Sequence, residues 1–261
     1  MRRPLVAANW KMHKHVQEAV AYARDFPPLI STIPNVDVVL APPFLAVPAV
    51  VETLRNDGHN RIRVAAQNVH FEPQGAFTGE VSLSMLQASG VTYVIVGHSE
   101  RRQLFHETDD SVNKKTRAAI AAGVIPIVCV GETLKDRESD RTFEVLDRQV
   151  RHGLAGLTPE QIATILVAYE PVWAIGTGQV ATPHQANEVH KRIRQQLTAL
   201  FSISASDACR IIYGGSVKPG NTAALMEQSD VDGALVGGAS LEPTTFARIV
   251  LACHETAVKD I

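Results

Sequence analysis

The stretch AYEPVWAIGTGQVATPHQ, residues 168–185, is laid out as the end of a strand, a loop and the start of a helix. An apolar run over residues 165–168 leads to the carboxylate of Glu170, and a proline follows at once. Because a residue before proline avoids the helical region, we expect Glu170 to lie in extended backbone at the strand end. Thr182 is a good N-cap and forms a capping-box pattern with Gln185. The stretch therefore predicts one strand–loop–helix unit that carries an acid at its carboxyl end.

Short apolar runs of this kind recur along the chain and alternate with amphipathic, helix-like segments. The runs are LVAANW from Leu5, VDVVLAP from Val36, IRVAAQN from Ile62, YVIVG from Tyr93, IPIVCVG from Ile125, TILVAYE from Thr164, RIIYGG from Arg210 and GALVGG from Gly233. Several are nearly continuous in apolar residues, which suits parallel strands covered by helices.

About eight such units in series, with no linker and no shift in composition, predict an α/β protein. We expect a single (β/α)8 barrel domain over residues 1–261. A doubly wound sheet is the alternative, but its G-x-G-x-x-G fingerprint after the first strand is absent, and so is a Walker A motif.

Composition limits the possible partners and locations. The chain has 261 residues, a net charge of -2 and 45% hydrophobic content, so nothing in its charge favours nucleic acid or an acidic membrane. No apolar run approaches the roughly 20 residues of a membrane span, and residues 1–3 do not open a signal peptide. The cysteines Cys129, Cys209 and Cys253 are far apart, so a disulfide framework is not expected. We expect a cytoplasmic protein in which Cys129 is a buried core residue.

Polar residues follow several of the predicted strands, and in such a barrel the chemistry lies at the carboxyl ends of the strands. Asn9 and Lys11 follow the first run, His98 and Glu100 the fourth, and Glu170 the sixth. A single strand-end Lys or Glu is usually a solvated rim residue, and His98 alone could be a helix cap or a structural histidine. Their joint occurrence at strand ends predicts one site.

Glycine pairs follow the last two strands: Gly214-Gly215 precedes Ser216, and Gly237-Gly238 follows the eighth run. They could be mere tight turns. However, successive backbone N–H groups at a helix start bind anions, and small residues let the backbone approach a ligand. Barrel enzymes often hold phosphate after these two strands. A phosphorylated small substrate is therefore predicted.

With these residues in view, the chain resembles the triosephosphate isomerase family over nearly its whole length. The motifs are ANWKM from Ala8, QNVHFEPQGAFTGE from Gln67, VGHSERR from Val96, AYEPVWAIGTG from Ala168, YGGSV from Tyr213 and GALVGGASL from Gly233. The resemblance implies a TIM barrel that interconverts dihydroxyacetone phosphate and D-glyceraldehyde 3-phosphate in glycolysis and gluconeogenesis, with no cofactor and no metal. One departure is His13, where relatives often carry Asn, but it lies outside the predicted site.

By the same resemblance, Glu170 is the base that moves a proton between adjacent carbons through an enediolate, and His98 is the electrophile. His98 is expected to be neutral because a helix begins beside it; the resembled family is a standard example of this pKa tuning. The resemblance also implies that Lys11 supplies positive charge, that Asn9 supplies an amide donor and that Glu100 orients Lys11.

The resemblance makes the quoted loop a lid that keeps water away from the enediolate. Residues 171–173 would form its first hinge, residues 174–176 its tip and residues 177–179 its second hinge. An ordinary connecting loop is the alternative. The implied donors to the substrate phosphate are Gly176, Ser216, Gly237 and Gly238.

Residues Gln67–Glu80 form a long connection for a compact barrel and carry Val69, Phe71 and Phe77. Aromatic residues on a surface loop suggest a protein partner, and a self-packed loop is the alternative. In the resembled family this loop enters a pocket of a second subunit. We therefore expect a homodimer with Thr78 near the partner active site, while the sequence leaves a tetramer open.

Two other functions compete with this hypothesis. One is a barrel isomerase for a larger phosphorylated sugar, which the motifs disfavour. The other is a phosphate-binding barrel without catalysis. That protein would have lost Glu170, His98 or Lys11 while keeping the glycine turns, and this chain has all three residues.

Overall fold

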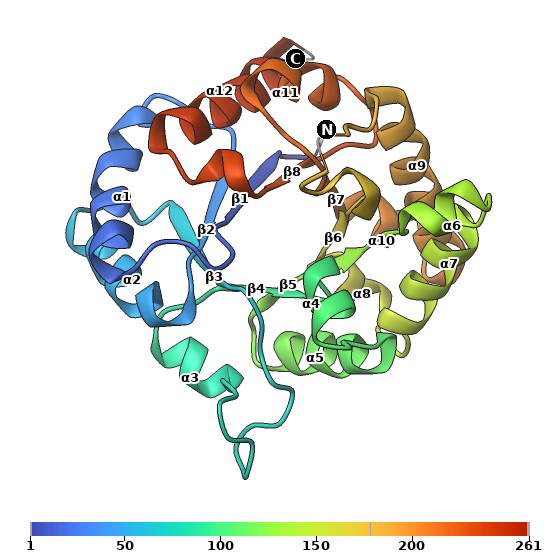
Figure 1. Cartoon of the computed structure of the whole chain (residues 1–261), viewed down its shortest axis with the longest axis horizontal. Helices are drawn as coiled ribbons and strands as arrows, with labels where there is room; N and C mark the ends of the chain where they lie inside the picture. The colour runs from blue at the N-terminus through green and yellow to red at the C-terminus, as the bar shows by residue number, and fades with distance from the viewer. Residues whose placement is uncertain (1, 178, 260–261) are drawn as a thin grey trace.

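The computed structural model describes residues 2–177 and 179–259. Within these residues, eight parallel strands pair in chain order to form a closed barrel that helices surround (Figure 1). The strands are β1 (Leu5–Asn9), β2 (Asp37–Ala41), β3 (Ile62–Ala66), β4 (Tyr93–Val96), β5 (Ile125–Val130), β6 (Leu166–Tyr169), β7 (Arg210–Tyr213) and β8 (Gly233–Val236). The predicted (β/α)8 barrel is confirmed.

The helices lie outside the ring of strands. They are α1 (Val16–Leu29), α2 (Val47–Asn56), α3 (Leu83–Ala88), α4 (Ser99–Leu104), α5 (Asp109–Ala121), α6 (Leu134–Glu138), α7 (Thr142–Gly153), α8 (Pro159–Ile162), α9 (Pro183–Leu200), α10 (Ile203–Ala208), α11 (Pro219–Met226) and α12 (Pro243–Lys259). Short 3-10 turns, η1 (Phe44–Ala46), η2 (Val172–Ala174) and η3 (Gly238–Ser240), follow β2, β6 and β8.

Both faces of the strands are largely buried, apart from the exposed Arg63 of β3, which explains why the apolar runs are nearly continuous. In β1, Leu5 and Ala7 belong to a cluster of side chains from the strands that fills the barrel. Val6 and Ala8 alternate with them and pack in the layer between strands and helices. Burial of a side chain such as Leu5 stabilises the fold by about 2 kcal/mol relative to an exposed position.

Hydrogen bonds between neighbouring strands continue one residue past the strand ends and align the rim. The N–H of Glu170 donates to the carbonyl of Val130 at 2.8 Å, and the N–H of Gly214 donates to the carbonyl of Tyr169 at 2.7 Å. A Cβ at Gly131 would lie 1.7 Å from the carbonyl oxygen of Glu170, so the residue after β5 must be glycine for the chain after β6 to approach. The acid is therefore fixed at the rim by main-chain contacts.

Local signals read from the sequence are confirmed at the helix ends. Thr182 caps α9, and its Oγ1 accepts from the N–H of Gln185 at 3.2 Å while Gln185 Oε1 accepts from the N–H of Thr182 at 2.9 Å. The apolar face of α9 is buried at Ala186, Val189, Ile193 and Leu197. Helix α5 ends at Ala121, and Gly123 adopts a φ of 72° beyond it.

The connection from β3 to α3 projects from the barrel as an arm, residues 67–80 (Figure 1). Val69 is buried, and the ring of His70 lies 4.5 Å from that of Phe71 and 4.2 Å from that of Phe77. Phe77 is still 43% exposed, and Thr78 beside it is exposed. The arm therefore packs partly on itself and presents apolar surface near its tip.

The cysteines Cys129, Cys209 and Cys253 are free and buried. Burial, followed by the nearby Glu170 carboxylate, raises the pKa of the Cys129 thiol well above its ordinary value. The prediction that Cys129 is a core residue is confirmed. Among the helices of the described ranges, none is both long enough and apolar enough to cross a membrane.

A histidine is buried between α9 and the barrel. The ring of His190 lies 5.8 Å from the ring of Tyr169 and 6.3 Å from that of Tyr213. Its Nδ1 lies 3.0 Å from the carbonyl oxygen of Asp230, so Nδ1 carries the proton and donates. Its Nε2 is buried and has no hydrogen-bond partner in the described part of the chain. Burial lowers the pKa of His190 to about 4, because a charged ring would lose its water there.

Buried His190 predicts that stability falls in acid. The unfolded chain regains the ordinary pKa of 6.5, so between pH 6.5 and about 4 it binds a proton that the folded chain does not. The contribution of His190 to the free energy of unfolding is therefore full above pH 6.5 and decreases as the pH falls to 4, by about 3 kcal/mol.

Urea unfolding across this window, at one fixed protein concentration, measures the effect. His190→Gln should lose less stability on acidification than the unsubstituted chain, because Gln does not titrate. His152→Gln, at an exposed position of α7, is the matched control and should keep the original slope. Equal slopes for His190→Gln and the unsubstituted chain would contradict the prediction.

Candidate active site

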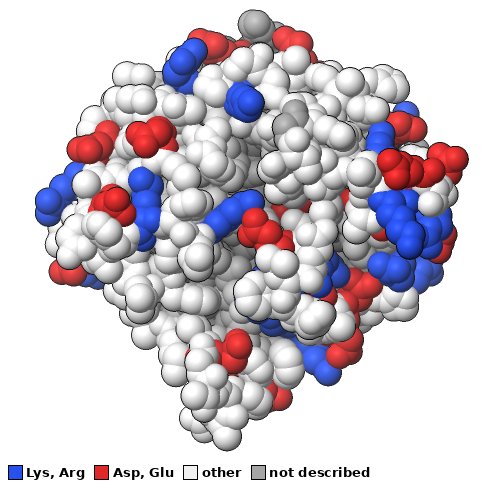
Figure 2. Space-filling model, in the orientation of Figure 1, with Lys and Arg blue, Asp and Glu red and all other residues white. Residues whose placement is uncertain are grey.

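The residues predicted to form the site surround a cavity of about 270 Å³ at the carboxyl ends of the strands. Its lining includes Asn9, Lys11, His98, Glu170, Gly176, Ser216, Gly237 and Gly238. Glu100 lines an adjoining cavity of about 210 Å³, which shares Asn9, Lys11 and His98 with the first. Figure 2 shows a face of the molecule that is hollowed near its centre, with positive and negative side chains side by side. The structure therefore brings all the predicted residues to one region.

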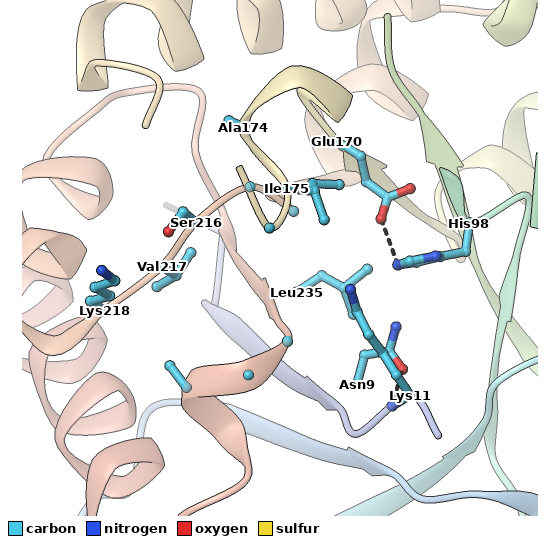
Figure 3. A pocket seen from close by; sticks show the side chains of 16 residues that line it. Asn9, Lys11, His98, Glu170, Ala174, Ile175, Ser216, Val217, Lys218 and Leu235 are labelled. Atoms are coloured by element: carbon cyan, nitrogen blue, oxygen red, sulfur yellow. Dashed lines mark hydrogen bonds and ion pairs between the residues drawn. The ribbon is translucent and has the colours of Figure 1, made fainter. Parts of the chain in front are cut away.

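Glu170 and His98 lie in the lining of the cavity and contact each other directly (Figure 3). Glu170 Oε1 lies 2.8 Å from His98 Nε2, and Glu170 Oε2 accepts from the N–H of Ser99 at 2.8 Å. Glu170 is only 2% exposed and His98 only 6%. Each oxygen of the buried carboxylate thus accepts a hydrogen bond, as a buried acceptor requires.

His98 is also the N-cap residue of α4. The N–H of Glu100 donates to His98 Nδ1 at 3.3 Å. A nitrogen that accepts carries no proton, so the proton lies on Nε2, which donates to Glu170. This hydrogen-bond pattern is that of a neutral imidazole. It leaves one imidazole proton, and that proton points at the acid.

Contact between the two side chains shifts both pKa values. Burial lowers the pKa of His98, but the charge of Glu170 and the hydrogen bond to it outweigh burial, so that the pKa is raised. Burial raises the pKa of Glu170, but the attraction and hydrogen bond of His98 and the N–H of Ser99 outweigh it, so that the pKa is lowered. The helix start alone predicts a lower pKa for His98, and the direction differs because the carboxylate touches the ring. A ligand that separates the pair removes both effects.

Lys11 enters the cavity from the residues that follow β1. It has a φ of 53°, an uncommon value for a residue other than glycine. Its N–H donates to Asn9 Oδ1 at 3.1 Å, and its carbonyl accepts from Gln67 Nε2 at 2.8 Å. Its Nζ lies 2.6 Å from Glu100 Oε1. Main-chain contacts and one ion pair therefore orient the amine.

The other side of the cavity is built from backbone turns. Figure 3 shows Ser216 and Val217 across the cavity from His98 and Glu170. The turn η3 begins at Gly238, and a Cβ at Gly237 would lie 3.4 Å from Lys11 Cε. The Lys11 amine is thus in reach of the turn that follows β8, where main-chain N–H groups can donate hydrogen bonds to an anion.

The loop after Glu170 is anchored where it begins. Glu132 Oε1 accepts from Trp173 Nε1 at 2.8 Å, from the Tyr169 hydroxyl at 3.1 Å and from Arg137 Nη1 at 3.2 Å. The carbonyl of Glu132 also accepts from the N–H of Val172 at 3.1 Å. Because Glu132 is fully buried, these bonds form away from water and fix the predicted first hinge.

The predicted tip of the loop is less constrained. Ile175 and Gly176 line the cavity, and Gly176 is exposed with a φ of 71°. Thr177 Oγ1 donates back to the carbonyl of Trp173 at 2.6 Å. Gly178, which the sequence places in the second hinge, lies outside the described residues.

Several residues at the site were not identified from the sequence. Val217, Lys218, Leu235 and Ala239 line the cavity, and Glu132 holds the loop. Leu235 could have been placed inside the barrel from the sequence, because it alternates with residues of β8 that face the helices. Glu132 follows the apolar run of β5 directly, so its place at a strand end was also a signal. Lys218 lies just beyond the YGGSV motif, and Ala239 lies within GALVGGASL but was given no role.

The available donors suit an anion. An amine, amide N–H groups, a hydroxyl and main-chain N–H groups line or adjoin the cavity. In residues 2–177 and 179–259, no group of three or more His, Cys, Asp or Glu side chains is arranged to hold a metal ion.

Known proteins are similar in sequence to this chain over nearly its whole length. The family model described as Triosephosphate isomerase matches residues 4–253. Triosephosphate isomerase of Endomicrobium trichonymphae is 52% identical over 250 residues, which are 96% of this chain and 98% of the relative. Those of Citrifermentans bemidjiense and Solibacter usitatus are each 53% identical over 250 residues, 96% of this chain and 98% and 99% of the relatives. The chain therefore belongs to the triosephosphate isomerase family.

Proposed function

We propose that the chain interconverts dihydroxyacetone phosphate and D-glyceraldehyde 3-phosphate, with Glu170 as base, His98 as electrophile and Lys11 as electrostatic stabiliser. Membership of the family makes the chain an intramolecular aldose–ketose isomerase of glycolysis. The observation that carries the assignment of roles is that an acid, an imidazole and an amine line one cavity that backbone turns complete.

The reaction needs more than a base. An ordinary carboxylate has a pKa of about 4, far below that of a carbon acid, and general base catalysis supplies only about 10²–10⁴-fold. Glu170 takes a proton from C1 of the ketose and returns it to C2 of the enediolate. His98 gives its Nε2 proton to the C2 oxygen and regains one from the C1 oxygen. Lys11 stabilises the negative charge that develops on these oxygens.

The contact between Glu170 and His98 suggests what substrate binding changes. The Nε2–H of His98 donates to Glu170 at 2.8 Å, so a substrate oxygen that takes this proton must displace the carboxylate. Displacement removes the charge that raises the pKa of His98, and it removes the His98 hydrogen bond that lowers the pKa of Glu170. Both changes favour a neutral electrophile and a stronger base.

Glu170→Gln tests the role of the base. The amide keeps the size of the side chain and cannot accept the carbon proton, so kcat/KM should fall by about 10³-fold or more. A coupled assay with glyceraldehyde 3-phosphate measures this, and titration with inorganic phosphate should show that the cavity still binds an anion. Glu160→Gln, at an outlying position on α8, is the control. Full activity in Glu170→Gln would remove Glu170 as the base.

We also propose that residues 171–179 act as a lid. Support comes from the anchor at Glu132, which fixes the beginning of the loop, and from the exposed Gly176 near its tip. A segment held firmly at one end with a free tip can move as a unit over the cavity. Closure would exclude water, which otherwise lets the enediolate lose its phosphate, and would strengthen the electrostatic interactions inside.

Deletion of residues 174–176 tests the lid. The shortened loop cannot cover the enediolate, so a larger share of the substrate should release inorganic phosphate. Phosphate and isomerised product are measured in the same reaction, after circular dichroism has shown that the variant is folded. An unchanged ratio of isomerisation to elimination would contradict the lid.

The arm, residues 67–80, supports a homodimer. Phe77 is 43% exposed at the arm, and Figure 2 shows few charged side chains on the part of the molecule that projects. The 210 Å³ cavity beside the active site is lined by Met12 and Phe105, which are 95% and 63% exposed. Exposed apolar side chains are present both on the arm and beside this cavity, so we place Thr78 of one subunit near the active site of the other.

Phe77→Asp tests the dimer. The carboxylate would have to be buried in the partner, so sedimentation equilibrium should show dissociation at concentrations where the unsubstituted chain is dimeric. Ile203→Asp, which alters an apolar residue 69% exposed on α10, is the matched control and should leave the mass unchanged. A monomeric or tetrameric unsubstituted chain would contradict the proposal.

We infer that residues 1–261 form one domain, supported by the closed barrel that includes both the first and the last strand. We place the protein in the cytoplasm, supported by the three free, buried cysteines. Cell fractionation that finds the protein outside the cytoplasm would overturn the second proposal.

A further inference from the structure

The charges around the cavity are nearly balanced. Two lysines, Lys11 and Lys218, and one acid, Glu170, line it. Lys11 is paired with Glu100 at 2.6 Å. Within residues 2–177 and 179–259, Lys218 has no ion-pair partner, so no neighbouring acid neutralises its charge. Without Lys218, these side chains would carry one excess negative charge, which would repel a doubly charged phosphate.

The backbone of Lys218 is tied to the turn that follows β7. The N–H of Lys218 donates to Asn221 Oδ1 at 2.8 Å, and Asn221 Nδ2 donates to the carbonyl of Ser216 at 2.9 Å. One side chain thus holds both the predicted phosphate turn and the lysine in a fixed relation. Lys218 itself is the N-cap residue of α11. The N-terminus of a helix favours negative charge nearby.

The position of Lys218 distinguishes it from the catalytic amine. Figure 3 shows Lys218 beside Val217, on the far side of the cavity from His98 and Glu170. Its side chain is exposed, whereas that of Lys11 is largely enclosed and paired. A solvated cation at the rim attracts an anion from a distance but adds little to the chemistry inside.

We propose that Lys218 is a substrate-recognition residue that attracts the phosphate group to the turn after β7. The proposal rests on the proposed function, because it requires a substrate with a phosphate. The charge of Lys218 accelerates association with the substrate. Removal of that charge should therefore lower kcat/KM, more strongly at low salt, and leave kcat nearly unchanged.

Lys218→Gln and Lys191→Gln form a matched pair of variants. Both remove one exposed positive charge, but Lys191 lies on α9 and does not line the cavity. With glyceraldehyde 3-phosphate at about 10 mM ionic strength, Lys218→Gln should lower kcat/KM about threefold while kcat stays within about twofold. The difference should shrink at about 150 mM ionic strength, where charges are screened. Lys191→Gln should behave as the unsubstituted chain, and Lys218→Arg should restore kcat/KM.

Calorimetric titration with inorganic phosphate supplies a readout that does not need catalysis. The Kd for phosphate should rise about threefold in Lys218→Gln and not in Lys191→Gln. Equal behaviour of these two variants in both measurements would overturn the role of Lys218. A loss of kcat that does not depend on salt would overturn it too, because that result indicates distortion of the turn. If the unsubstituted chain binds phosphate but does not isomerise the substrate, the proposed function fails while the phosphate titration still tests Lys218.

Discussion

The pairing of β1 with β8 closes the sheet into a ring, and the site depends on that closure. Gly233 makes it possible: its φ is 144°, and a Cβ there would lie 1.9 Å from the carbonyl oxygen of Leu5. In an open sheet, Lys11 and Gly237 would follow strands at opposite edges. In the ring, Gly237 is in contact range of the Lys11 side chain. The first and last strands therefore supply adjoining parts of one cavity.

Burial of the Glu170–His98 pair sets a balance between stability and reactivity. An ionised carboxylate that is 2% exposed would be costly without partners, and the imidazole and the N–H of Ser99 offset that cost. The same contacts make Glu170 a weaker base than burial alone would produce. Contacts that stabilise the ionised Glu170 thus also lower its basicity. A ligand that separates Glu170 from His98 would remove this stabilisation and raise the basicity of Glu170.

Features with local causes could be predicted from the sequence. The continuous apolar runs indicated buried parallel strands, and Thr182 with Gln185 marked the start of α9, because each signal lies within a few residues. The site residues could be located because a parallel barrel gathers strand ends at one rim. Glu132 was missed because its role arises from contacts 37 and 41 residues away. The direction of the His98 pKa shift was also beyond local reasoning, since it depends on contact with Glu170.

The hydrogen bonds of Glu132 connect the loop after Glu170 to the strand before it. A single carboxylate oxygen receives hydrogen bonds from Tyr169, at the end of the strand that carries the acid, and from Trp173, at the start of the loop. Rotation of Trp173 away from that oxygen would break the second of these bonds. Arrangements in between would leave a buried indole N–H unpaired, which is costly. Glu132 Oε1 therefore serves as one buried fixed point that joins the start of the loop to the end of β6.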